Sequence, residues 1–178
     1  MQLIEKTVAK NYVYKGKIIS VRNDDALLPN GLPCKREIIE HSGGACVLCV
    51  NENSVLLVKQ YRYAYGECVY EIPAGKLEKG EDPMWAAKRE LEEEGGVTAG
   101  ELKLLYVIYP TPGYTDEKIY LYEASNCQFG AAHLDEDEFL TAEFVPLEQV
   151  KQMLLNGEIH DSKTIIALQH YFLVASKR

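Results

Sequence analysis

The residues best suited to chemistry are three glutamates, Glu90, Glu93 and Glu94, which lie between Asp82 and Gly96. If this stretch is a helix, residues three and four positions apart share one face. Carboxylates crowded on one face repel each other, and a hard divalent cation such as Mg²⁺, which prefers oxygen ligands, offsets that repulsion. The alternative is a solvated acidic helix face, and three glutamates by themselves favour that alternative.

The surrounding residues predict a helix over about residues 83–94. Asp82 is a suitable N-cap, and Pro83 fits the first helical position. Gly95 and Gly96 supply a stop at the C-terminal end. An apolar stripe that would hold the acidic edge against the protein body consists of Met84, Ala87 and Leu91.

The wider segment, residues 75–97, matches the Nudix box, G-x5-E-x7-R-E-U-x-E-E-x-G-U, in which U is a bulky apolar residue. All nine specified positions are filled, by Gly75, Glu81, Arg89, Glu90, Leu91, Glu93, Glu94, Gly96 and Val97. A chance match at nine positions is very improbable. The chain therefore resembles the Nudix hydrolases, and the resemblance implies an α/β/α sandwich and Mg²⁺-dependent cleavage of a nucleoside diphosphate linked to another group.

The resemblance assigns separate roles to these residues. Glu90, Glu93 and Glu94 are expected to bind Mg²⁺, with Mn²⁺ as an alternative ion, and the family adds the carbonyl of Ala74 as a ligand. The metal would neutralise the diphosphate and generate a hydroxide-like water, with Glu93 counted in the catalytic set. Arg89 is expected to orient the glutamates through a bidentate pair rather than to touch the substrate.

Two further box residues lie in the loop before the helix. Gly75 permits a close approach of the backbone. Glu81 is expected either to tie the loop to Arg89 or to assist a metal ion. Both residues are therefore expected to shape the loop that precedes the acidic helix.

Flanking segments resemble the ADP-ribose pyrophosphatase branch of the family. They are Gln60-Tyr-Arg62-Tyr, Glu71-Ile-Pro-Ala-Gly75-Lys-Leu-Glu78 and Pro112, which lies fifteen residues past Val97. The resemblance extends over about residues 14–171 and implies ADP-ribose or a related ADP-sugar as substrate. Three alternatives stay open. They are a hydrolase of another nucleoside diphosphate sugar, a non-catalytic sensing module of the same family, and an acidic domain that binds Ca²⁺ or Mg²⁺ without turnover.

The expected substrate-binding residues are Arg62, Glu71, Arg36, Pro112 and Gly113. The planar guanidinium of Arg62 suits a phosphate, although Arg62 could instead pair with a surface acid. Glu71 is placed by the family pattern near the metals or the terminal ribose, and its alternative role is that of a strand-edge acid.

A base is expected in the acidic run Asp135-Glu136-Asp137-Glu138. Related enzymes carry a catalytic glutamate on a mobile loop at this place, and a hydroxide-generating site benefits from a proton acceptor. Glu136 is the first choice and Glu138 the second. The alternative is a solvated turn.

The first forty residues predict an antiparallel sheet. Residues 11–22 and 33–41 are rich in Tyr, Val and Ile, and the turn signal Pro29-Asn-Gly lies between them. We expect residues 1–42 to form a β-sheet extension and residues 43–178 to form the Nudix domain. In this branch the N-terminal strands usually exchange between two subunits, which implies a homodimer. Possible contributors to the nucleotide pocket are Tyr12, Tyr14, Arg22 and Arg36.

Hydrophobic periodicity predicts the elements that position the box. Helices are expected at residues 147–156 and 162–175 as well as in the box. Strands are expected at residues 44–50, 55–61, 68–72, 103–109, 118–123 and 139–145. Strands mixed with a few helices indicate an α/β sandwich.

Composition excludes several classes of function. The chain has 178 residues and a net charge of −8, which disfavours binding to nucleic acid or anionic lipid. The longest apolar run, residues 45–50, is far below the length of a membrane span. Charges at Glu5, Lys6 and Lys10 stand where a secretory signal would be apolar. We expect a cytoplasmic protein.

Cysteines and histidines give no sign of a metal or redox site. The five cysteines form an odd set, as expected for reduced thiols. Cys46 and Cys49 match C-x-x-C, but in a strand their side chains would point to opposite faces. The four histidines, for which we expect structural roles, are His41, His133, His160 and His170.

Overall fold

The computed structural model describes residues 3–134 and 138–174. The chain divides into two compact units. The first unit is Met1–Gly43 together with Tyr109–Lys118, and the second is Gly44–Ile108 together with Ile119–Arg178. Each unit is built around its own β-sheet.

The first unit is a four-stranded antiparallel sheet. Its strands are β1 (Lys6–Ala9), β2 (Tyr12–Lys15), β3 (Ile19–Leu27) and β4 (Pro33–His41). Strand β3 pairs with all three others. The predicted turn between β3 and β4 contains Gly31, which has a φ of 83° that suits glycine. The strand-rich segment 11–22 is divided at Gly16, whose N–H bonds to the carbonyl of Ile19 at 2.9 Å.

A loop from the middle of the chain completes the first unit. The backbone N–H of Ile39 in β4 donates to the carbonyl of Tyr114 at 2.7 Å, and the N–H of Asp116 donates to the carbonyl of Ile39 at 3.1 Å. Asp116 also accepts a hydrogen bond from the N–H of His41 at 2.9 Å. The segment Tyr109–Lys118 is thus attached to β4 like a short added strand.

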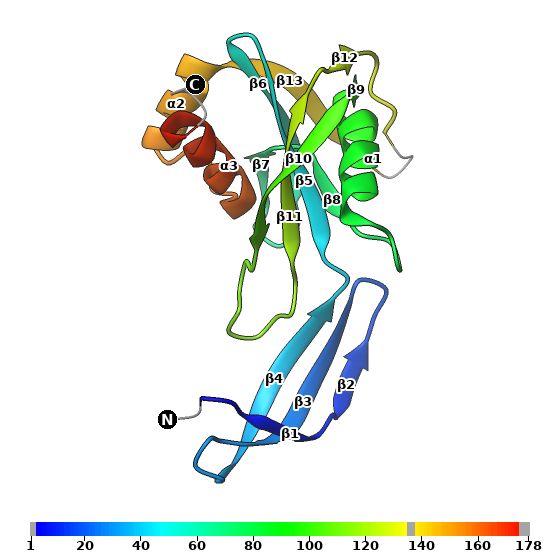
Figure 1. Ribbon diagram of the computed structural model, residues 1–178, viewed down its shortest axis with the longest axis vertical. Coiled ribbons are helices and arrows are strands. Elements are labelled where there is room, and N and C mark those ends of the chain that lie inside the picture. Colours follow the sequence, from blue (N-terminus) through cyan, green and yellow to red (C-terminus); the bar gives the residue numbers. More distant parts are fainter. Residues whose placement is uncertain (1–2, 135–137, 175–178) are drawn as a thin grey trace. The chain divides into compact units, whose positions relative to one another are not determined.

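The second unit contains a mixed seven-stranded sheet (Figure 1). The strands run in the order β10-β11-β5-β6-β13, with β7 beside β6 and β8 beside β5. Their bounds are β5 (Gly44–Asn51), β6 (Ser54–Arg62), β7 (Glu67–Glu71), β8 (Ala74–Lys76), β10 (Glu101–Ile108), β11 (Ile119–Ser125) and β13 (Leu140–Pro146). Strands β9 (Val97–Thr98) and β12 (Gln128–Phe129) pair with each other. The β5–β11 pair is parallel, so this sheet is not a simple meander.

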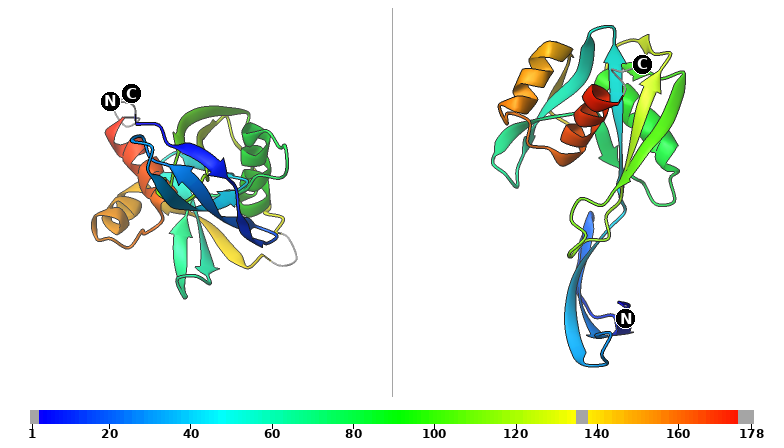
Figure 2. Two further views of the ribbon diagram at one scale, coloured as in Figure 1. Left: turned by 90° about the horizontal axis from the view of Figure 1, so that it is seen from below. Right: turned by 60° about the vertical axis from the view of Figure 1, so that its left-hand side comes forward.

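Three helices cover the two faces of this sheet. They are α1 (Pro83–Gly95), α2 (Leu147–Leu155) and α3 (Ser162–Leu173). Helix α1 lies on one face, and α2 and α3 lie on the other (Figures 1 and 2). This arrangement confirms the predicted α/β/α sandwich. No helix within the described parts of the chain is long and apolar enough to cross a membrane.

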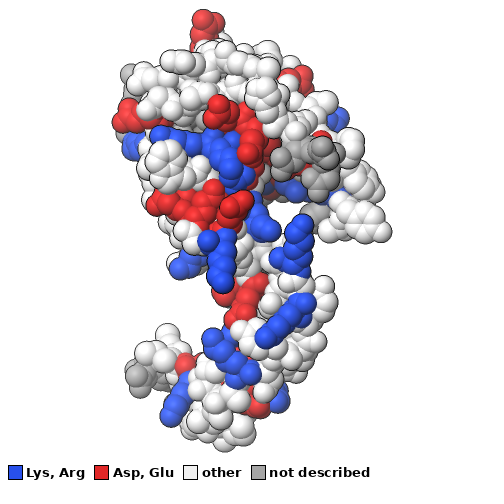
Figure 3. Space-filling model, turned by 90° about the vertical axis from the view of Figure 1, so that its right-hand side faces the viewer, with Lys and Arg blue, Asp and Glu red and all other residues white. Residues whose placement is uncertain are grey.

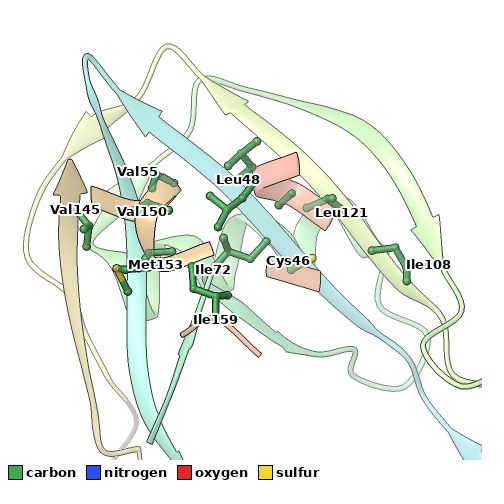
Figure 4. Packing of buried hydrophobic residues seen from close by; sticks show 13 residues of the cluster. Cys46, Leu48, Val55, Ile72, Ile108, Leu121, Val145, Val150, Met153 and Ile159 are labelled. Atoms are coloured by element: carbon green, nitrogen blue, oxygen red, sulfur yellow. The ribbon is translucent and has the colours of Figure 1, made fainter. Parts of the chain in front are cut away.

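The core of the second unit has two layers. One layer lies between the sheet and α2 and α3, where Leu48, Leu121 and Val150 meet (Figure 4). The other lies between the sheet and α1. Strand β5 serves both layers because its side chains alternate, so that Cys46 belongs to the first and Cys49 to the second. The prediction that these two cysteines point to opposite faces is confirmed.

Candidate active site

The cluster of acidic residues is organised by helix α1. Asp82 caps the helix by accepting a hydrogen bond from the N–H of Met84 at 2.9 Å. Gly96 ends it with a φ of 63°, and its N–H donates to the carbonyl of Glu92. These ends confirm the predicted helix. Its inner face buries Glu90 and Glu94, which are only 6% and 3% exposed.

Two glycines of the box stand where a side chain would collide with neighbouring atoms. A Cβ atom at Gly75 would overlap the carboxylate of Glu90. A Cβ atom at Gly96 would come within 2.7 Å of the backbone of Ala131 and Ala132. The chain that leads toward the acidic run after residue 134 is therefore packed directly against the end of α1.

Arg89 gathers the acidic side chains of the box. Its Nη1 lies 2.7 Å from Oε1 of Glu90 and 2.9 Å from Oε2 of Glu93. Its Nε and Nη2 lie 3.2 and 3.3 Å from the carboxylate of Glu81. Glu81 also accepts a hydrogen bond from the N–H of Glu78 at 2.8 Å. One guanidinium thus joins the loop before α1 to two glutamates of the helix.

The positive charge near Glu90 and Glu94 does not offset the burial of their carboxylates. Burial raises the pKa of Glu90 to about 7, and the neighbouring charges of Glu93 and Glu138 add to the shift, while Arg89 opposes it. Burial likewise raises the pKa of Glu94 to about 8. The N–H of Ala74, which donates to Glu94 at 2.8 Å, does not offset this burial. Without a bound cation, the ionisation of both carboxylates at once is therefore unfavourable.

The donor set fits a divalent cation that is completed by a substrate. Among residues 3–134 and 138–174, no three acidic, histidine or cysteine side chains are arranged to hold a metal ion by themselves. Glu93 is instead paired with Arg89. Mg²⁺ commonly uses only one or two carboxylates, with waters and substrate phosphates as its other ligands. The buried pair Glu90 and Glu94 beside the backbone of Ala74 matches that pattern.

A second cluster surrounds Glu71, which is 2% exposed at the end of β7. Arg62 binds it with two hydrogen bonds, from Nε to Oε1 at 2.5 Å and from Nη2 to Oε2 at 2.6 Å. Lys163 at the start of α3 lies 2.5 Å from the same Oε2. Lys163 is also 3.0 Å from Oδ1 of Asp161, the N-cap of α3. The cluster contains two cations and two anions.

In this second cluster, the opposite charges of neighbouring side chains outweigh the effect of burial on Glu71 and Lys163. Burial alone would raise the pKa of Glu71, but the hydrogen bonds and charges of Arg62 and Lys163 outweigh it and lower the pKa. Burial opposes the charge on Lys163, yet Asp161 and Glu71 raise its pKa. Lys163 and Asp161 are site residues that the sequence did not predict, since the local signal is limited to an N-cap residue, Asp161, before a predicted helix.

The remaining predicted residues lie in different parts of the chain. Glu138, at the start of the chain that enters β13, is close enough for its charge to raise the pKa of Glu90 and of Glu94. Glu136 lies outside the described residues. Arg36, Pro112 and Gly113 belong to the first unit, which is described separately from the second.

Within the first unit, Arg36 already has an anionic partner. Its Nε and Nη2 donate to Glu5 at 2.8 and 2.5 Å, and the pair is exposed. Pro112 lines a cavity of about 240 Å³ with Tyr109 and Lys118. Arg22 is buried between Asp24 and Glu40.

Charge is distributed unevenly over the second unit. Figure 3 shows acidic side chains gathered around a band of basic ones on the side that α1 covers. The acidic cluster and the basic partners of Glu71 are linked electrostatically, since Glu71 raises the pKa of Glu94 and Glu94 raises that of Arg62. This combination suits a ligand that carries several phosphate charges together with a divalent cation.

Comparisons with known proteins agree with this geometry. The model of the NUDIX domain matches residues 40–168. The ADP-ribose pyrophosphatase of Bacillus subtilis (strain 168) is 42% identical over 171 residues, which are 94% of this chain and 92% of that protein. The methanol dehydrogenase activator of Bacillus methanolicus is 43% identical over 169 residues, which are 93% of this chain and 91% of that protein.

A solved structure supports the same fold. The crystal structure of an ADP compounds hydrolase superposes with a TM-score of 0.82, covering 99% of this chain and 96% of that one at 22% identity. Nudix hydrolases generally need a divalent metal ion, in agreement with the undercompensated carboxylates of α1. With its complete box on a capped helix and the domain match over residues 40–168, the chain belongs to the Nudix family.

Proposed function

We propose that this enzyme hydrolyses the diphosphate bond of ADP-ribose, or of a closely related ADP-sugar, to AMP and ribose 5-phosphate. The observation that carries this proposal is the juxtaposition of the buried, undercompensated Glu90 and Glu94 with the anchored guanidinium of Arg62. Such a site offers a place for a cation and a donor for phosphate oxygens. The likeness to an ADP-ribose pyrophosphatase over most of the chain supports the choice of substrate.

Each side chain then has a defined task. Glu90, Glu94, Glu93 and the carbonyl of Ala74 are the proposed ligands of Mg²⁺, with Mn²⁺ as a possible substitute. The bound ion would neutralise the diphosphate and lower the pKa of a water molecule. Arg89 holds Glu90 and Glu93 in place through its hydrogen bonds.

Proton transfer falls to the chain that leads into β13. Glu136, or in its place Glu138, accepts the proton of the attacking water. The charge of Glu138 raises the pKa of Glu90 and of Glu94, which supports a base in this acidic run. Arg62 binds the diphosphate through Nη1, which has no hydrogen-bond partner among the described residues.

A substrate panel tests the proposal. The protein is incubated with Mg²⁺ and ADP-ribose, ADP-glucose, GDP-mannose, NADH or a diadenosine polyphosphate, and products are identified by chromatography. AMP and ribose 5-phosphate should form fastest from ADP-ribose, and chelation of the metal should stop the reaction. Comparable rates on non-adenine sugars would point to a different nucleoside diphosphate sugar. Binding without turnover would indicate a sensing module instead.

A second candidate function comes from the relative in Bacillus methanolicus, which is a methanol dehydrogenase activator. If this chain acts in the same way, adding it to a methanol dehydrogenase should raise the rate of methanol oxidation. The Glu94→Gln variant in the same assay shows whether any such effect requires the acidic site. No change in rate with the wild-type protein would exclude this second function.

A homodimer formed through residues 1–42 is part of the proposal. Support comes from the small sheet of the first unit, which exposes apolar side chains on β1 and β2, including Val8 and Val13. Light scattering on the full-length protein should give the mass of two chains at micromolar concentration. A monomer would contradict both the dimer and strand exchange. A cytoplasmic location is also proposed, because the described cysteines are all free.

A further inference from the structure

We propose that Lys163 is a positioning residue for the diphosphate site, which acts through Glu71 to hold Arg62 in its binding orientation. The inference rests on the proposed function, in which Arg62 is a ligand of the diphosphate.

Arg62 is fixed along one edge and free along the other. Its Nε and Nη2 both donate to Glu71, while its Nη1 has no hydrogen-bond partner among the described residues. The side chain is 41% exposed, so part of it is within reach of a ligand. A guanidinium held in this way loses little conformational freedom when a phosphate binds.

The position of Arg62 therefore depends on what holds Glu71. Oε2 of Glu71 accepts hydrogen bonds from both Arg62 and Lys163. Lys163 is only 8% exposed and comes from α3, whereas Arg62 and Glu71 belong to the β6–β7 hairpin. Lys163 thus ties this hairpin to a helix that is distant in sequence.

The anchor continues into the body of the protein. Asp161 pairs with Lys163 through Oδ1, and its Oδ2 accepts hydrogen bonds from both N and Oγ1 of Thr164. Thr164 in turn accepts a hydrogen bond from the N–H of Ile72, the residue after Glu71. The connection closes on itself, from Glu71 through Lys163, Asp161 and Thr164 back to Ile72. Such a closed set of hydrogen bonds restrains both the backbone and the carboxylate.

Without Lys163, Oε2 of the buried Glu71 carboxylate would lose one of its two donors. The Glu71 carboxylate and the guanidinium that binds it could then shift together, because Lys163 would no longer hold the pair against α3. A displacement of about 1 Å in a binding group can cost about 10²-fold in rate. A purely structural lysine would lower stability but would not act through Arg62.

A double-mutant cycle separates these two roles. The kcat and KM for ADP-ribose with saturating Mg²⁺ are measured for the wild type, Lys163→Met, Arg62→Ala and the double variant, together with each Tm. Lys163→Met should raise KM and lower kcat/KM by about tenfold or more. In the Arg62→Ala background the same change should lower kcat/KM by less than about threefold, while its effect on Tm persists.

Other variants complete the test. Lys163→Arg keeps the charge and should recover part of kcat/KM. Lys59→Met is the matched control, since Lys59 is an exposed lysine of the same hairpin that contacts Tyr70 and not Glu71. If Lys163→Met does not fold, Asp161→Asn takes its place, because asparagine still caps a helix but no longer pairs with Lys163 as an anion.

The outcomes are distinct. Equal losses of kcat/KM from Lys163→Met in both backgrounds would overturn the positioning role. A normal kcat/KM for Arg62→Ala would show that Arg62 does not bind the diphosphate, and the inference would fall with it. A wild-type protein that cleaves no nucleoside diphosphate would refute the proposed function itself.

Discussion

Two clusters of buried carboxylates in the second unit differ in how their charge is balanced. Glu71 is surrounded by Arg62 and Lys163, and its pKa is lowered although the residue is buried. Glu90 pairs with Arg89, which also binds Glu81 and Glu93, and Glu94 accepts a hydrogen bond only from the N–H of Ala74 among the described residues. Their pKa values are raised to about 7 and 8. Burial is similar in both clusters. The difference teaches that the charge of the Glu71 cluster is balanced within the protein, whereas the cluster of Glu90 and Glu94 gains from a cation supplied from outside.

The largest effect should come from loss of the base. Glu136→Gln, or Glu138→Gln if that residue is the base, should lower kcat by about 10²- to 10⁴-fold with little change in KM or in the dependence on Mg²⁺. Steady-state kinetics over a range of Mg²⁺ concentrations provide the measurement. Glu143→Gln is the control, because Glu143 is an exposed acid on β13. Less than a tenfold loss in both variants would exclude this segment as the source of the base.

The next largest effect is expected from replacing one of the two buried carboxylates of α1, Glu90 and Glu94. Glu94→Gln should lower activity by at least about 10²-fold, since it removes an anionic ligand but keeps an acceptor for the N–H of Ala74. The same change should leave the metal-free protein at pH 8 as stable as the wild type or more stable, because repulsion is relieved. Turnover and Tm are measured in parallel, with the exposed Glu92→Gln as the matched control. Normal turnover at saturating Mg²⁺ would refute the ligand role of Glu94.

The two clusters should also respond to pH in opposite directions. In the folded, metal-free protein Glu90 and Glu94 keep protons that the unfolded chain releases near its ordinary pKa of 4.5. Their contribution to stability is therefore complete below pH 4.5 and is lost as pH rises through 7 to 8. Glu71 has a lowered pKa, so its contribution is present above pH 4.5 and is lost on further acidification.

Thermal denaturation against pH provides the measurement for this contrast. In the presence of a chelator, Tm should fall between about pH 5 and 8, and saturating Mg²⁺ should restore it most strongly at the alkaline end. Glu94→Gln should flatten the alkaline slope without changing the acidic one. An unchanged alkaline slope in that variant would contradict the assigned shift.

The smallest effect is expected for an ion pair on the surface. Arg36 and Glu5 form two hydrogen bonds in the first unit, but both side chains are exposed, and solvent screens such pairs. Glu5→Gln should leave Tm unchanged within error at 0.15 M salt. A clear loss of stability would mean that this pair is shielded from solvent, for example in a homodimer.

Local signals explain what the sequence could predict. The caps of α1 lie next to the helix in the chain, and the spacing of the glutamates follows from the helical period, so the acidic face could be located directly. The contacts of Arg89 with Glu90 and Glu93 are equally local. Strand β8 was not predicted, since it has only three residues and its pairing with β5 depends on the sheet.

The features that the sequence did not predict depend on contacts between segments that are far apart in the chain. Lys163 is 92 residues from Glu71, and nothing in its local sequence indicates which acid it meets. The segment Tyr109–Lys118 likewise joins β4 through backbone hydrogen bonds, which any sequence without proline at the donor could form. Such pairings follow from the order of strands in the sheets, and that order is not encoded in a short motif.

Because the side chains of β5 alternate between the two core layers, transient opening of each layer of the second unit can be followed separately. Burial raises the pKa of both Cys46 and Cys49 to about 12, so neither thiol reacts readily while its layer stays closed. Cys46 is shielded by α2 and α3, and Cys49 by the layer beneath α1. Rates of thiol labelling at these two positions would therefore report separately on transient opening of the two layers. Labelling of Cys49 would thus report on the layer next to the acidic helix α1, and labelling of Cys46 on the layer next to α3, the helix that contains Lys163.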